Sequence, residues 1–127
     1  DLKIKNILSD KSKNIMKLEK KNNINIFTQI LKGYPVKEIR NLIDKEKNNE
    51  KKIIFVFSIV DSKTSIAVGV SSDLVDQYDA ANIIKNIVTS LGGKGGGGRK
   101  DFAQTGSGIL TTDQINKIVS EFIKTIN

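Results

Sequence analysis

The chain of 127 residues contains no cysteine, no histidine and no tryptophan, and it has only one proline. Without cysteine it can form neither a disulfide bond nor a thiolate metal site. The absence of histidine removes the commonest general base, the commonest metal ligand and any nucleophile that histidine would activate. Carboxylate catalysis stays open, but no close pair of acids in an apolar setting stands out.

The chain also lacks long apolar runs. No window of about 18 apolar residues is present, so we expect no membrane partner. No signal-peptide pattern opens the sequence. The length fits one domain with a short appendage. Because the first residue is Asp1 rather than methionine, we expect a piece of a longer chain.

What the chain has in excess is positive charge. Lysine and arginine number 21 against 14 aspartate and glutamate residues, which gives a net charge of +7. Such a balance favours polyanionic partners. A base-composition bias of the gene would also raise the lysine content, and both explanations stay open.

The first segment, 1–22, contains seven lysines and three acids. Ile4, Leu8, Ile15 and Leu18 recur at helical spacing, which predicts a helix at the end of a helical or coiled-coil arm. Two interpretations of its lysines stay open, because they could solvate the helix or follow a nucleic-acid backbone. The asparagines that follow break the period, so we expect a joint there.

The rest of the chain predicts a sheet with helices. The expected strands are 24–31, 53–60, 64–70 and 101–105, and the expected helices are 36–47, 78–91 and one capped by Thr112 or Asp113. The run at 53–60 is almost continuously apolar, which indicates a central strand buried on both faces.

This order predicts the α/β (α+β) class, as a two-layer sandwich of a mixed β-sheet with helices. Its elements follow the order β-α-β-β-α-β-α, preceded by one helix from the arm. We therefore expect residues 1–23 to end the arm and residues 24–127 to form the globular domain.

Eight of the ten glycines lie in the segment 92–108. The spacing GxGxxG at 93–98 matches the dinucleotide-binding fingerprint, but a helix precedes it where that fingerprint needs a strand. The Walker A pattern fails because neither Lys94 nor Lys100 is followed by serine or threonine. A flexible linker would join two units, whereas only a short strand and one helix remain after this segment.

Two interpretations of these glycines remain. In the first, backbone N–H groups approach an anion closely, and Lys94, Arg99 and Lys100 add charge. The C-terminus of the preceding helix opposes an anion through its dipole, so the cations would supply the attraction. In the second, the glycines let the loop pack tightly, and Asp101 neutralises Arg99.

The stretch GGKGGGGRKDFAQTG at 92–106 resembles the signature of the DHHA1-type C-terminal (C-Ala) domain of alanyl-tRNA synthetases, whose usual form is GGKGGG-R-P-D-[MF]-A-Q-[AG]-G. The resemblance covers about residues 24–127. Two departures stand in the motif. One extra glycine leaves the register of 95–98 against the family open, and Lys100 replaces a common proline.

The resemblance implies a tRNA-binding module that holds the tRNA elbow and aids aminoacylation and editing. The RNA-binding residues that we expect are Lys94, Gly95, Gly96, Gly97, Gly98, Arg99, Lys100 and Gln104. Tyr78, at a helix start after a polar loop, is added because flat side chains can cover the unstacked bases of RNA corners. Phe102 is expected in the core instead.

The resemblance also implies partners and an origin. The parent would be an ATP-dependent alanine–tRNA ligase in the cytoplasm, with an organelle left open. Its ATP and zinc sites would lie upstream, so we expect no catalytic residue, cofactor or metal in this chain. The expected partners are tRNA, which is tRNA alanine in the parent, the upstream domains and a second copy in some members of the family.

Two other functions stay open. One is an accessory domain of a DHH-type phosphodiesterase that grips nucleic acid, although that version usually carries a histidine in the glycine motif. The other is a dimerisation module led by the first segment.

Overall fold

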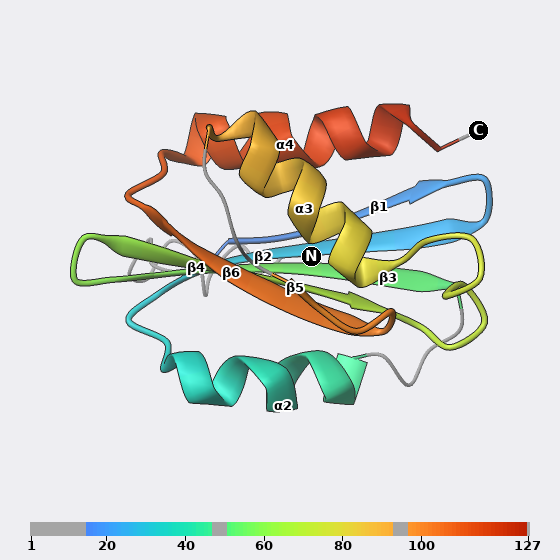
Figure 1. Ribbon diagram of the computed structural model, residues 1–127, viewed down its shortest axis with the longest axis horizontal. Coiled ribbons are helices and arrows are strands. Elements are labelled where there is room, and N and C mark those ends of the chain that lie inside the picture. The colour runs from blue at the N-terminus through green and yellow to red at the C-terminus, as the bar shows by residue number, and fades with distance from the viewer. Residues whose placement is uncertain (1–14, 47–50, 93–96, 127) are drawn as a thin grey trace, which may run out of the picture.

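The computed structural model describes residues 15–46, 51–92 and 97–126. Six strands form one sheet in the order β1-β2-β3-β4-β6-β5 (Figure 1). The strands are β1 (Ile15–Lys21), β2 (Ile24–Lys32), β3 (Lys52–Val60), β4 (Lys63–Val70), β5 (Gly97–Gly98) and β6 (Phe102–Gly108). The helices are α2 (Val36–Glu46), α3 (Ala80–Ser90) and α4 (Thr112–Lys124). The expected class, a mixed sheet with helices, is confirmed.

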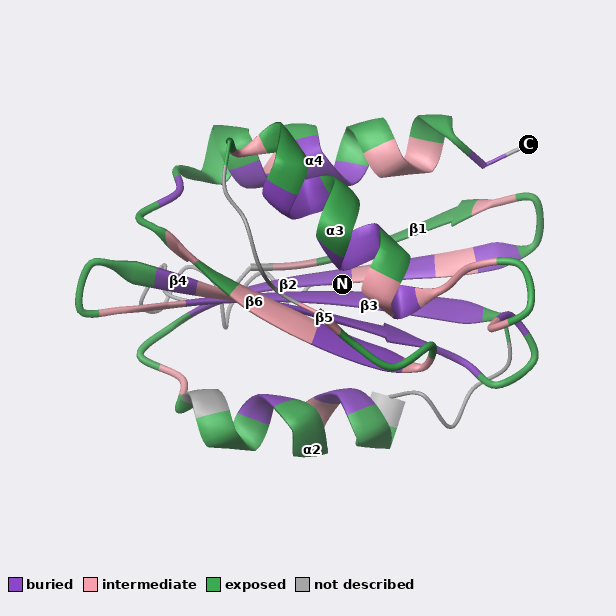
Figure 2. Ribbon diagram, in the orientation of Figure 1, coloured by how far each residue is buried: buried purple, intermediate pink, exposed green. Residues whose placement is uncertain are grey.

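The centre of the sheet is β3. It runs parallel to β2 and antiparallel to β4, and α2 makes the crossover that a parallel pair requires. Its sequence KIIFVFSIV is buried over its first seven residues, as the apolar run predicts (Figure 2). Phe55 and Phe57 point into one core cluster, and Ile54 and Val56 into another.

The helices cover both faces of the sheet, with α2 on one face and α3 and α4 on the other (Figure 1). The two core clusters correspond to these faces, since Ile39 and Ile43 of α2 belong to one, and Ile84 and Ile115 of α3 and α4 to the other. The molecule therefore has three layers, and the expected number of two was wrong. A strand that is apolar on both faces needs cover on both.

The helix predicted for 1–22 is wrong where the structure describes that segment. Ile15–Lys21 is strand β1, which pairs antiparallel with all but the last two residues of β2. Asn22 and Asn23 turn the chain with φ of 53° and 67°. Asparagine tolerates this left-handed region, so the two asparagines mark a tight hairpin turn and not a joint between units.

The two helices on the second face have well-defined starts. Asp79 caps α3 by accepting hydrogen bonds from the N–H groups of Ala81 and Asn82. Thr111 caps α4 in a capping box with Gln114, so the expected caps one and two residues later were wrong. None of the helices in the described ranges is long and apolar enough to cross a membrane.

Candidate nucleic-acid interface

The second half of the glycine motif forms a tight hairpin. Gly97 and Gly98 of β5 pair with Gln104 and Ala103 of β6. The N–H of Arg99 donates to the carbonyl oxygen of Phe102 at 2.7 Å, which closes a turn through Lys100 and Asp101. The structure therefore gathers Gly97, Gly98, Arg99, Lys100 and Gln104 of the predicted site in one hairpin. Three further predicted residues, Lys94, Gly95 and Gly96, lie outside the described residues.

The turn is fixed by its own backbone. The carbonyl oxygen of Lys100 accepts from the N–H of Ala80 at 2.8 Å, and that of Asp101 accepts from the N–H of Val70 at 3.0 Å. The side chains of Arg99 and Lys100 stay exposed. The backbone of the turn is thus anchored to the first residue of α3 and to the end of β4, and these bonds do not use its two cationic side chains.

This anchoring changes the electrostatic expectation for the loop. The loop does begin at the C-terminal end of α3, where Gly92 has a φ of 76° and stops the helix. Its cationic turn, however, returns to the N-terminal end of the same helix, as the bond from Ala80 shows. The dipole of α3 therefore does not oppose an anion at Arg99 and Lys100, and because the Asp79 carboxylate already caps this end of the helix, the two cations supply the attraction.

Of the two interpretations of the glycines, tight packing applies at one position and open space for a ligand at another. A Cβ at Gly98 would lie 2.5 Å from both Ala103 Cα and Phe102 O, so β6 leaves no room for a side chain there. A Cβ at Gly97 would meet nothing within 4 Å. Tight packing therefore accounts for Gly98, whereas the space beside Gly97 is open to a ligand.

The expected pairing of Arg99 with Asp101 is present. Arg99 Nε lies 3.7 Å from Asp101 Oδ1, with side chains 65% and 43% exposed. An ion pair this exposed contributes about 1 kcal/mol or less. Such a weak pair leaves Arg99 able to exchange its partner for a phosphate.

The two aromatic residues near the motif have different environments. Phe102 is buried, as expected, with the Arg40 guanidinium 5.1 Å from its ring centroid. Tyr78 is half-buried, and its ring centroid lies 6.0 Å from that of Phe122 in an edge-on contact. Tyr78 is two residues before Ala80, so it lies near the cationic turn. Gln104 is on the α2 face with Phe102, and the structure does not bring it together with Tyr78.

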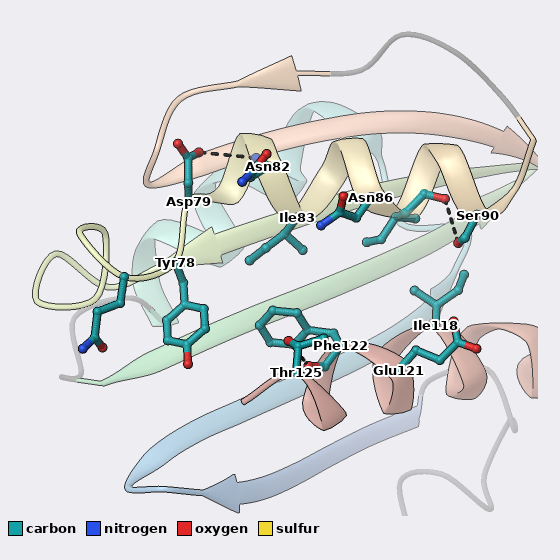
Figure 3. Close-up of a pocket in the computed structure, with 12 residues that line it drawn as sticks. Tyr78, Asp79, Asn82, Ile83, Asn86, Ser90, Ile118, Glu121, Phe122 and Thr125 are labelled. Carbon is teal, nitrogen blue, oxygen red and sulfur yellow. Dashed lines mark hydrogen bonds between the residues drawn. The ribbon is translucent and has the colours of Figure 1, made fainter. Parts of the chain in front are cut away.

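A groove between α3 and α4 is a feature that sequence reasoning missed. Its volume is about 390 Å³, and Figure 3 shows side chains of both helices facing it. The lining includes Gln77, Tyr78, Asp79, Asn82, Ile83, Asn86, Ile87, Ser90, Ile118, Glu121, Phe122 and Thr125. The sequence feature that could have indicated the groove is a stripe of α3 residues at 82, 83, 86, 87 and 90, which share one side of a helix.

The loop that leads to Tyr78 is tied to the start of β3. The Asp73 carboxylate accepts from the Ser71 hydroxyl at 2.6 Å and from the Lys51 N–H at 3.0 Å. These two bonds, the first of them above all, lower the pKa of Asp73 from its ordinary value of 3.8. Within the described part of the chain, no three potential metal ligands are grouped.

Comparisons with known proteins agree with this geometry. The chain is similar to the alanine–tRNA ligases of Hyphomonas neptunium (37% identity over 67% of this chain), Parvibaculum lavamentivorans (39% over 65%) and Vesicomyosocius okutanii (33% over 72%). It spans about a tenth of the length of these relatives.

A solved structure and a family model cover more of the chain. The C-Ala domain of Aquifex aeolicus alanyl-tRNA synthetase matches with a TM-score of 0.76 and 28% identity, over 86% of this chain and 96% of that one. The resemblance seen in the glycine motif is thereby confirmed. The model of the DHHA1 domain matches residues 23–127, and the chain therefore belongs to the DHHA1 domain family.

Proposed function

We propose that this chain is the tRNA-binding C-terminal domain of an alanine–tRNA ligase and that its β5–β6 hairpin grips the tRNA elbow. One observation carries the proposal. The second half of the motif that resembles C-Ala domains, from Gly97 onward, folds into a turn whose backbone is bonded to α3 and β4, and Arg99 and Lys100 stand exposed on it.

The physical basis is charge neutralisation on a fixed support. Lysine and arginine release counterions when they neutralise phosphates, which gives affinity that does not depend on sequence and falls with salt. Since the turn is already ordered by its hydrogen bonds, little backbone freedom is lost on binding. Gly97 adds space at which a sugar or phosphate can approach the backbone.

The chemistry of the parent enzyme belongs to other parts of its chain in this proposal. ATP and zinc would bind there, since this chain has neither cysteine nor histidine to hold zinc. The domain would contribute tRNA binding to aminoacylation and editing in the cytoplasm, and in a dimeric parent it would meet a second copy. Residues 24–127 form the RNA-binding unit, and β1 completes its sheet.

Titration of the chain with fluorescent tRNAs tests the proposal. We expect tRNA alanine and several other tRNAs to bind within about a hundredfold of one another, or about 3 kcal/mol, because phosphate contacts carry no sequence information. Unstructured RNA of the same length is the control, and it should bind more weakly because it has no elbow. Absence of tRNA binding, or equal binding of the unstructured RNA, would contradict the proposal.

A further inference from the structure

The groove between α3 and α4 has an apolar floor and a polar rim. Ile83, Ile87 and Ile118 form the floor and are almost fully buried. Asn82 and Asn86 of α3 and Glu121 of α4 are exposed at the rim (Figure 3). An apolar base with a few polar groups around it is the usual composition of a small-molecule site, and about 390 Å³ is within the usual range of volume.

An aromatic series leads from the surface of this groove into the core. The Tyr78 ring contacts the Phe122 ring edge-on, and the Phe122 centroid lies 5.4 Å from that of Phe55. Phe55 is fully buried, whereas Tyr78 and Phe122 are half-buried and line the groove. The two outer rings are therefore supported from within and present aromatic surface to an occupant.

The groove adjoins the cationic turn. Tyr78 and Asp79 line one end of it, and Ala80, the next residue, is the one that bonds to the carbonyl oxygen of Lys100. A polynucleotide whose backbone is held at Arg99 and Lys100 would thus have the groove within reach of its bases. The rim itself carries the amides of Asn82 and Asn86, which suit the edge of a base, and the carboxylate of Glu121, which repels a phosphate.

We propose that this groove holds one unstacked nucleobase of the bound RNA, and that the base carries an exocyclic amino group. The inference rests on the proposed function, because the hairpin supplies the backbone contact. The ring lies against Tyr78 and Phe122, the amino group donates to the carboxylate of Glu121, and the amides of Asn82 and Asn86 bond to the remaining edge. A carboxylate accepts from such an amino group and repels the carbonyl oxygen of uracil.

Filling the groove tests its role without changing any charge. We expect Asn86→Trp to weaken tRNA binding about tenfold, within the range that stacking of one base supplies, while the dependence on salt stays that of the unchanged chain. Thr89→Trp is the matched control, because Thr89 is exposed on the same helix and does not line the groove. Thermal melts of both variants check that the fold is kept.

The outcomes separate the two proposals. If the unchanged chain binds no tRNA, the proposed function fails. If it binds and Asn86→Trp binds equally well, the groove proposal is overturned and the hairpin proposal stands, which would leave the groove to a peptide or another occupant. Equal losses in Asn86→Trp and Thr89→Trp would also overturn it, because the loss would then not depend on the groove.

Base selectivity gives a second test. Oligocytidylate and oligouridylate of equal length differ at the position where cytosine has an amino group and uracil a carbonyl oxygen. We expect several-fold tighter binding of oligocytidylate, and we expect Glu121→Gln to remove the difference because an amide serves both bases. Equal binding of the two oligomers to the unchanged chain would overturn the assignment of Glu121.

Discussion

The two edges of the sheet are both basic, but the cations of one edge lie on a strand and those of the other lie on a turn. At one edge, β1 carries Lys17, Lys20 and Lys21. At the other edge, Arg99 and Lys100 stand on the turn between β5 and β6. Four strands separate these edges.

At the β1 edge, two of the three lysines have partners within the fold. Lys17 lies 3.9 Å from Glu19, and Lys21 Nζ donates to the carbonyl oxygen of Ile123 in the last turn of α4. At the β5 edge, the backbone of the turn makes the bonds to α3 and β4, and the exposed Arg99 has an ion pair with Asp101 at 3.7 Å that is similar to the pair of Lys17 with Glu19. Positive charge alone therefore does not distinguish a binding edge from a structural one.

The largest effect is expected from a single methyl group at the β5 edge. Gly98→Ala should lower the free energy of unfolding by about 3 kcal/mol, because the added Cβ meets the backbone of β6 and a φ of 156° strains a side chain. Urea unfolding followed by circular dichroism measures this loss.

The neighbouring glycine is the matched control for that measurement. Gly97→Ala has the same φ but an unobstructed Cβ, so it should lose only the strain, about 1 kcal/mol. Similar losses at both positions would show that β5 does not pack against β6 as closely as described.

A smaller loss of stability is expected when the other edge is removed. Deletion of residues 1–22 takes away β1, whose described residues belong to neither core cluster. We expect a single cooperative thermal transition at a lower Tm, with a loss of about 1–2 kcal/mol and about 4–8 °C for each kcal/mol. Loss of the cooperative transition would show that β1 is essential to the core.

The same deletion also tests which edge of the sheet binds RNA. If RNA contacts the β5 edge, the deleted chain should keep the slope of log affinity against log salt concentration. A reduced slope would place phosphates on the lysines of the removed segment.

The smallest expected effect is on the melting temperature at low pH. The pKa of Asp73 is lowered in the folded state, so its stabilising effect is complete above its ordinary pKa and is lost as the pH falls through the folded pKa. Asp73→Asn should therefore melt below the unchanged chain at pH 7, and the two melting temperatures should converge toward pH 3. Parallel curves would contradict the assigned hydrogen bonds, which support only the loop before α3.

The contrast between the edges also explains what the sequence could predict. The central strand and the β3–β4 hairpin were predictable, because their apolar patterns hold over whole elements. The β5–β6 hairpin was partly predictable, since Phe102 was expected in the core and residues 101–105 in a strand. Its turn beside the start of α3 depends on backbone bonds between distant segments, which no local pattern reveals.

At the β1 edge, the sequence misled because Ile15 and Leu18 continue a helical spacing that begins at Ile4 and Leu8. The paired asparagines were the usable signal for a hairpin. The stripe on α3 was a signal for one side of the groove. The whole groove could not be predicted, because its lining combines residues 77–90 with residues 118–125, whose proximity follows only from the packing of α3 against α4. Lys94, Gly95 and Gly96 stay predicted contacts.

The salt dependence of tRNA binding tests the central claim most directly. Arg99→Ala with Lys100→Ala should reduce the magnitude of the slope of log affinity against log salt concentration by about 1.4–1.8, at about 0.7–0.9 for each phosphate contact. Lys17→Ala with Lys20→Ala removes the same charge at the other edge. The slope measured for this variant should equal that of the unchanged chain. An unaltered slope in the Arg99 and Lys100 variant, or an equal reduction in both variants, would contradict the assignment of the β5–β6 hairpin as the RNA-binding edge.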